Sequence, residues 1–284
     1  MPTVHVHDID LYYEEEGSGE PLLLIMGLAA DSLAWLYQRP AFAQHYRTIV
    51  FDNRGVGRSS KPPGPYSTAL MARDAKGLLD ALDLPTAHVL GVSMGGMIAQ
   101  ELALQFPAAV RSLVLACTYA SVDEAILARR DALVAQLGGQ VEADGSIRID
   151  LAQLDPFRFF QTLLPLVFNP DYLAREMPKL IELFSASLQY GFSPEGILGQ
   201  VAAVLSHDAS ERLPQLQVPT LVLTGDADRL VPPECSERLA ALIPGARLVK
   251  IPGGSHAFNL EMPEEFNRVV LEFLASVSRS GCVP

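Results

Sequence analysis

Short, continuous apolar runs alternate with amphipathic stretches over most of this chain. Such runs are typical of buried parallel strands, whereas apolar residues that recur every three or four positions predict helices. An antiparallel strand pair at residues 4–7 and 9–13, with a turn at Asp8, precedes the runs. The runs predicted as strands are 21–25, 48–51, 87–92, 110–116, 219–224 and 247–251.

Amphipathic or polar-flanked segments between these strands predict helices. The predicted helices are 35–45, 67–84, a helix that follows Ser93 and ends before Pro107, 233–242 and 263–276. Regular alternation of strand and helix predicts an α/β fold, in which an eight-stranded, mostly parallel sheet is covered by helices on both faces.

This alternation is interrupted between residues 119 and 213. Helical stretches at 123–137, 156–167, 170–188 and 194–205 occur there without a convincing buried strand, and 138–150 reads as a polar loop or short hairpin. We therefore predict a core domain formed by residues 1–118 and 214–284, with a helical cap (lid) insertion at 119–213.

Composition narrows the class of partner. The 284 residues are 49% hydrophobic and carry a formal net charge of −12, a surface that repels nucleic acid and anionic membranes. Three scattered cysteines, Cys117, Cys235 and Cys282, form neither a disulfide framework nor a zinc motif. Neither a signal peptide nor an apolar run long enough to span a bilayer is visible. We expect a cytoplasmic protein that acts on a small molecule; no oligomeric state is predicted.

The most informative motif is Gly-x-Ser-x-Gly around Ser93, between a predicted strand and a predicted helix. In that order it predicts a nucleophile elbow, a sharp turn that exposes a serine hydroxyl. The motif alone occurs by chance in roughly one chain in ten. The alternative is a glycine-rich turn with an idle serine, so the prediction needs a base and an acid further along the chain.

Loops that directly follow two later strands carry such residues. His256 is the candidate base, and Asp226 and Asp228 are the candidate acids; the alternative for both carboxylates is a solvated loop or a helix cap. The other histidines, His5, His7, His45, His88 and His207, are interpreted as surface or structural residues. For the oxyanion hole we predict the backbone N–H groups of Met94, just after the serine, and Leu28, in the loop after strand 21–25.

Five ordered motifs, at 25–28, 52–59, 91–96, 225–232 and 253–256, make the chain resemble the α/β-hydrolase family. The motif Gly-x-x-Asp-x-x-Val-Pro implies Asp228 as the acid of a Ser93–Asp228–His256 triad. The motifs are most similar to 3-oxoadipate enol-lactonases, cofactor-free carboxylesterases and perhydrolases, and carbon–carbon bond hydrolases. Met26 stands where the family usually has histidine, a change that leaves the backbone donor in place.

The resemblance implies a serine hydrolase of a carboxylic ester or lactone, with neither cofactor nor metal. The alternatives are a carbon–carbon bond hydrolase of ring-cleavage products and a small-molecule receptor with residual hydrolysis. Eight aromatic residues of the cap, all between residues 157 and 192, predict an apolar lid, although each ring alone fits the cap's own core better. Arg158 and Arg175 could meet a substrate carboxylate but are better interpreted as solvated, and the net charge favours a neutral ester.

Overall fold

The computed structural model describes residues 2–136, 139–142, 147–148 and 155–280. Its main sheet has eight strands in the order β1-β2-β4-β3-β5-β6-β9-β10. The pairs β1·β2 and β2·β4 are antiparallel and the others are parallel, which confirms the predicted sheet. The strands are β1 Thr3–Val6, β2 Ile9–Glu16, β3 Pro21–Ile25, β4 Arg47–Phe51, β5 Ala87–Val92, β6 Val110–Ala116, β9 Thr220–Gly225 and β10 Arg247–Ile251.

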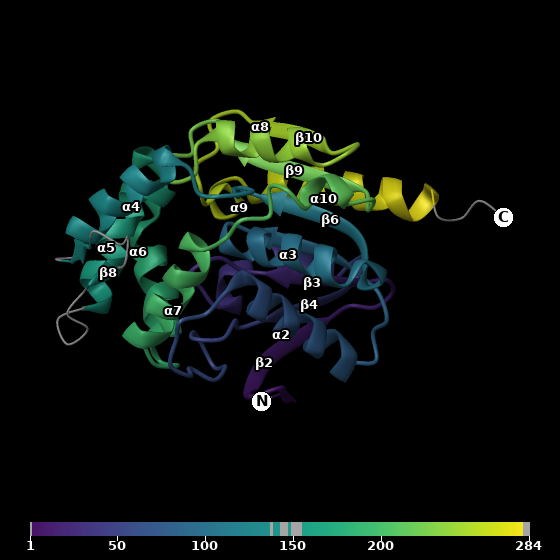
Figure 1. Cartoon of the computed structure of the whole chain (residues 1–284), viewed down its shortest axis with the longest axis horizontal. Helices are drawn as coiled ribbons and strands as arrows, with labels where there is room; N and C mark the ends of the chain where they lie inside the picture. The colour runs from purple at the N-terminus through teal and green to yellow at the C-terminus, as the bar shows by residue number, and fades with distance from the viewer. Residues whose placement is uncertain (1, 137–138, 143–146, 149–154, 281–284) are drawn as a thin grey trace.

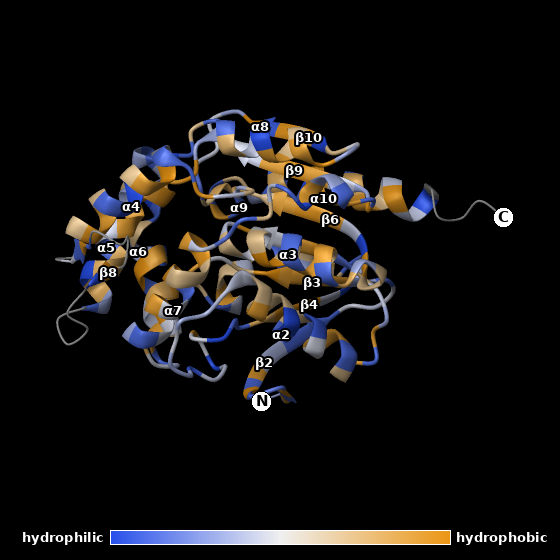
Figure 2. Cartoon of the chain, in the orientation of Figure 1, coloured by the Kyte–Doolittle hydropathy of each residue, from blue (hydrophilic) through white to orange (hydrophobic). Residues whose placement is uncertain are grey.

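Helices cover both faces of this sheet. Leu23 and Ile25 of β3 pack into one hydrophobic cluster and Leu22 and Leu24 into the other, as alternating strand residues must. The first cluster includes side chains of α2 (Thr68–Ala81), α3 (Met94–Gln105) and α8 (Pro233–Leu242), and the second those of α1 (Gln38–Phe42), α9 (Phe258–Glu261) and α10 (Pro263–Ser280). Figure 2 shows the most hydrophobic colouring on the central strands.

One predicted helix is wrong in its extent. In place of a helix over 35–45, the chain forms a 3-10 turn at Ser32–Trp35 and then the five-residue helix α1. Pro40 lies inside α1, and its ring excludes the backbone carbonyl of Leu36 from a continuous helix. Asp31 begins the 3-10 turn as its N-cap, because its side chain accepts the N–H of Leu33.

Among the described residues, four α-helices follow β6 and precede β9, where the cap was predicted. They are α4 (Glu124–Gln136), α5 (Pro156–Val167), α6 (Pro170–Leu188) and α7 (Pro194–Leu205), and Figure 1 shows them gathered on one side of the molecule. The strands β7 (Gln140–Val141) and β8 (Ile147–Arg148) pair antiparallel, which favours the hairpin of the two alternatives, loop or hairpin, for 138–150. Residues 138, 143–146 and 149–150 of that segment, residue 137 at the end of the predicted helix 123–137, and Cys282 lie outside the described residues. We use "cap segment" below for residues 119–213, whose boundaries stay a prediction.

Of the helices in the described residues, none combines the length and apolar character needed to cross a membrane.

Candidate active site

The turn between β5 and α3 holds Ser93 in an uncommon backbone conformation. Its φ of 57° and ψ of −122° lie outside the common regions for a non-glycine residue. Two glycines leave the space for this turn: a Cβ at Gly91 would lie 2.2 Å from the carbonyl oxygen of Gly95, and one at Gly95 would lie 2.0 Å from that of Ile25. Any side chain at either glycine would therefore displace backbone.

Two backbone segments flank Ser93. Met94 is the first residue of α3, so its N–H has no partner within the helix and lies at the positive end of the helix dipole. The loop after β3 passes close by, since a Cβ at Gly27 would lie 3.1 Å from Cβ of Ser93. The predicted oxyanion donors, Met94 and Leu28, thus belong to the two segments that border the serine.

His256 and Asp228 meet as a buried pair. Nδ1 of His256 lies 2.8 Å from Oδ2 of Asp228. Oδ1 of Asp228 accepts the N–H groups of Leu230 at 2.9 Å and Val231 at 2.8 Å, which orients the carboxylate. An ionised carboxylate only accepts hydrogen bonds, so the proton of the neutral ring lies on Nδ1 and the lone pair on Nε2.

The alternative acid, Asp226, does not bond to the imidazole. Its side chain is exposed and accepts the N–H of Gly253 at 2.6 Å. Of the two candidate acids, the fold brings only Asp228 into hydrogen-bond contact with His256.

Cys117 is a neighbour of this pair that sequence reasoning missed. Burial, and then the charge of Asp228, raise the pKa of its thiol well above the ordinary value, so the thiol stays protonated. Among the described residues, one atom each of Cys117, Asp228 and His256 lie within 4.8 Å of one another, a spacing that could hold a metal ion. Because Asp228 and His256 are already bonded to each other, we assign no metal to this group. A cysteine at the end of an apolar strand gave no sequence signal for this contact.

Other histidines take structural positions. His207 is buried beside Thr68 and Gln100, at 3.0 and 3.3 Å, and burial lowers its pKa to about 4. His88 is buried between Ser112 and Glu20, and burial lowers its pKa as well. Neither histidine belongs to the cavities that reach Ser93.

Two apolar cavities, of about 240 and 150 Å³, share Ser93 in their walls. The larger also contains His256 and is closed by side chains of α5 and α6. The smaller extends toward α4 and α7. Leu28, Phe159, Leu163 and Leu230 line both, so the serine lies at their junction.

The eight aromatic side chains between residues 157 and 192 differ in what they contact. Phe159, Phe160, Phe168 and Phe184 line the larger cavity, as an apolar lid requires. Phe157 is 48% exposed. Tyr172 and Phe192 pack against the cavity-lining rings of Phe168 and Phe159, and Tyr190 contacts Arg58. Arg158 and Arg175 are exposed and line neither cavity, as solvated helix residues do.

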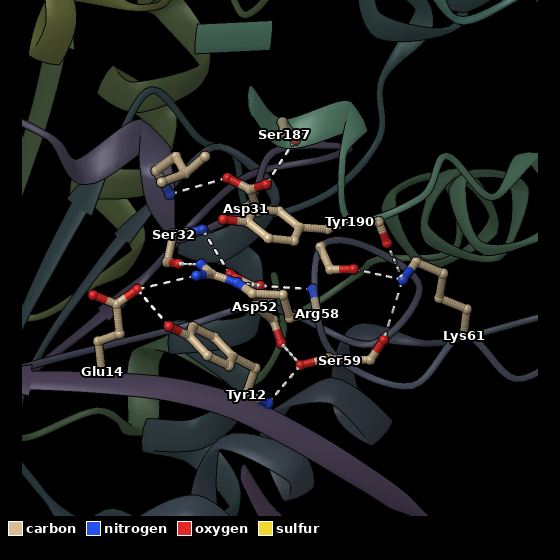
Figure 3. Close-up of polar contacts among 12 residues, drawn as sticks. Tyr12, Glu14, Asp31, Ser32, Asp52, Arg58, Ser59, Lys61, Ser187 and Tyr190 are labelled. Atoms are coloured by element: carbon tan, nitrogen blue, oxygen red, sulfur yellow. Dashed lines mark hydrogen bonds and ion pairs between the residues drawn. The ribbon is translucent and has the colours of Figure 1, made fainter. Parts of the chain in front are cut away.

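A polar network ties the cap segment to the core beside the larger cavity (Figure 3). The buried Asp31 accepts the hydroxyl of Ser187, on α6, at 2.6 Å, and burial raises the pKa of its carboxyl. Arg58 stacks between Tyr12 and Tyr190, with its guanidinium carbon 3.6 and 4.5 Å from the ring centroids. These contacts hold the C-terminal end of α6 against the core.

The guanidinium of Arg58 is also held by the carboxylate of Asp52. Nε of Arg58 donates to Asp52 at 3.0 Å, and Asp52 also accepts the N–H groups of Arg58 and Ser32, both at 2.8 Å. Lys61 extends the network by donating to the backbone oxygen of Tyr190 at 3.3 Å. The segment 52–59, one of the five motifs, therefore supports the site rather than entering the cavities.

Known proteins resemble this chain over nearly its whole length. A family model described as the alpha/beta hydrolase fold matches residues 20–263. The protein named carbamate hydrolase RutD of Azorhizobium caulinodans is 34% identical over 287 residues, which span 98% of this chain and 100% of the relative. These matches confirm the resemblance predicted from the motifs.

Two solved structures extend the comparison. The enol-lactonase of Burkholderia xenovorans LB400 is 27% identical, with a TM-score of 0.83, over 96% of this chain and 100% of that one. A thermophilic esterase of Thermogutta terrifontis is 30% identical, with a TM-score of 0.79, over 95% and 94% of the two chains.

Proposed function

The chain belongs to the α/β-hydrolase family, and from that premise we propose that it is a serine hydrolase that cleaves a carboxylic ester or a lactone. One observation carries the proposal: the buried His256–Asp228 pair opens on a cavity that Ser93 also lines. A serine hydroxyl is a weak nucleophile at neutral pH, and an oriented imidazole is the base that activates it.

In the proposed reaction, Oγ of Ser93 attacks the substrate carbonyl while Nε2 of His256 takes the hydroxyl proton. Asp228 holds the imidazole in the required tautomer and stabilises the imidazolium that forms. The N–H groups of Leu28 and Met94 bind the oxygen that becomes negative. His256 then returns the proton to the leaving alcohol, and water releases the acyl group from Ser93 by the same route.

The cavity walls favour a neutral, apolar substrate over a dicarboxylate. Among the described residues that line the larger cavity there is no lysine or arginine, and Asp31 would repel a carboxylate. Arg129 and Arg130 border the smaller cavity, but Arg129 donates to the backbone oxygen of Arg229 and Arg130 pairs with Asp131. We therefore propose an ester or lactone without a free carboxylate.

The test is hydrolysis of p-nitrophenyl acetate, butyrate and octanoate by the wild type, Ser93→Ala and Ser236→Ala. Ser236 is another buried serine, on α8, outside both cavities, and serves as the matched control. We expect hydrolysis that Ser93→Ala reduces by about 10⁴-fold or more and Ser236→Ala leaves within a few-fold.

Substantial hydrolysis by Ser93→Ala would refute the assignment of the nucleophile. If the folded wild type hydrolyses no ester but cleaves a vinylogous ring-cleavage diketone, the carbon–carbon hydrolase alternative is correct. Binding of such a compound without turnover, with a rise in the melting temperature, would identify a receptor.

A further inference from the structure

The loop that carries the proposed oxyanion donor Leu28 has an uncommon conformation. Its next residue, Ala29, has a φ of 61°, in the left-handed region that non-glycine residues rarely occupy. The preceding Met26 has a side chain that is at best a weak hydrogen-bond acceptor. Other groups must therefore hold the loop in place, and two buried amides do so.

The first amide belongs to the core. Asn53, which follows β4 by two residues, donates from Nδ2 to the backbone oxygen of Met26 at 2.9 Å. This bond fixes the start of the loop, just where it leaves β3.

The second amide comes from the cap segment. Gln200, on α7, is fully buried, and its Oε1 accepts the N–H of Ala29 at 2.8 Å. Its Nε2 donates to the backbone oxygen of Arg54 at 2.8 Å. With one donor and one acceptor to satisfy, the amide has a single orientation, because a flipped amide would face both partners with the wrong group.

The far end of this bridge is itself rigid. The side chain of Arg54 is 2% exposed and bonds to Asp74 through Nε at 2.5 Å and Nη2 at 2.8 Å. Gln200 therefore links the loop to a fixed point in the core, and Leu28 lies between two anchored neighbours, Met26 and Ala29.

Docking of α7 does not depend on this amide alone. A Cβ at Gly196 would lie 2.3 Å from the backbone oxygen of Gly55, and one at Gly199 would lie 2.6 Å from the ring of Tyr66. The helix is thus already packed closely on the core through two glycines. An apolar side chain at position 200 would fill the same space, so the amide has a role beyond packing.

We propose that Gln200 is a positioning residue for the oxyanion hole: through the N–H of Ala29 it fixes the direction of the Leu28 N–H. This inference rests on the proposed function. It makes α7 a support for the transition state as well as a wall of the smaller cavity. Because the oxyanion forms only during reaction, displacing its donor lowers kcat and affects KM little.

The test compares Gln200→Met, which keeps the volume and removes both bonds, with Gln200→Asn, which keeps the amide but is too short to span both partners. The matched control is Gln100→Met, since Gln100 is also fully buried and makes two hydrogen bonds, to the backbone oxygen of Tyr119 and to His207. Kinetics on p-nitrophenyl butyrate are measured beside inhibition by 1-butaneboronic acid, whose adduct with Ser93 presents a tetrahedral oxygen to the hole.

We expect both Gln200 variants to lose about 10- to 100-fold in kcat and a similar factor in boronate affinity, with KM within about threefold of wild type. Gln100→Met should lose thermal stability and keep its boronate affinity. If Gln200→Met fails to fold, the milder Gln200→Asn decides the question by the same two readouts.

Folded Gln200 variants that change only KM or stability, or that lose no more boronate affinity than Gln100→Met, would overturn the proposal. Failure of the proposed function is a separate result: the wild type itself would then neither hydrolyse the ester nor bind the boronate through Ser93.

Discussion

Asp228 divides its carboxylate between two tasks, with Oδ2 placed 2.8 Å from Nδ1 of His256 and Oδ1 bound by two backbone N–H groups. The backbone bonds fix the carboxyl plane, so the histidine meets an acceptor that cannot rotate away. The neighbouring acid, Asp226, faces solvent and holds the turn at Gly253 instead.

This division predicts different outcomes for two similar substitutions. Asp228→Asn should lower kcat/KM for p-nitrophenyl butyrate by about 10⁴-fold, because the amide favours the wrong imidazole tautomer. Asp226→Asn, which keeps an acceptor for Gly253, should stay within about threefold of wild type. The opposite order would move the acid to Asp226.

The elbow predicts a steric limit at Gly95. Gly95→Ala places a methyl group 2.0 Å from the carbonyl oxygen of Ile25, so backbone must shift, and we expect loss of soluble protein or a large fall in melting temperature. Gly245→Ala is the control, because Gly245 has a φ of 71° but open space around it. That variant should lose only about 1 kcal/mol in a urea titration. Equal losses in the two variants would contradict the steric argument.

Burial of His207 predicts a specific acid sensitivity. The pKa of His207 in the folded protein is about 4, below its value of about 6.5 in the unfolded chain, so the folded state binds the proton less tightly. Neutral His207 therefore contributes to the free energy of unfolding above pH 6.5. This contribution is lost as the pH falls toward 4, and the total loss is roughly 3 kcal/mol. His207→Gln should flatten the fall in unfolding free energy over this interval, as measured by urea titrations. If the variant shows the same dependence of unfolding free energy on pH as the wild type, groups other than His207 cause the acid sensitivity.

The two cavities predict that acyl and alcohol selectivity can be altered separately. Leu183 lines only the larger cavity and Val201 only the smaller. Leu183→Trp and Val201→Trp should each reduce kcat/KM for the long members of one series, acyl or alcohol, by about tenfold or more. The measurement compares p-nitrophenyl acetate to octanoate with methyl to hexyl butyrate. If both variants reduce kcat/KM for the long members of the same series, the two cavities do not have separate roles.

Local sequence patterns predicted most of the fold because burial of a strand and the start of a helix depend on residues that are adjacent in the chain. Continuous apolar runs marked the buried strands, and the proline after Asp155 or Ser193 marked where two cap helices begin. The helix at 35–45 was wrong because Pro40, inside the segment, outweighed the helical appearance of its neighbours.

The candidate site was predictable only where a motif carries it. Ser93, Asp228 and His256 lie in loops that follow β5, β9 and β10, so chain order and strand ends nominated Ser93, His256 and two possible acids. The family motif was needed to choose Asp228 over Asp226. Gln200 and Cys117 were not nominated, since the residues that each one contacts are distant in sequence. Gln200 lies 171 residues from Ala29 along the chain, and no periodicity reports a contact of that kind.

The backbone conformation of Ser93 lowers the stability of the fold at the position that carries the proposed nucleophile. A serine held at φ 57° and ψ −122° stores about 1–3 kcal/mol of strain that glycine would release. Directed evolution that scored heat resistance alone would therefore enrich glycine at position 93 and discard the proposed nucleophile. A screen for thermally stable variants of this protein should therefore measure catalytic activity in every round, so that stable variants without the proposed nucleophile are excluded.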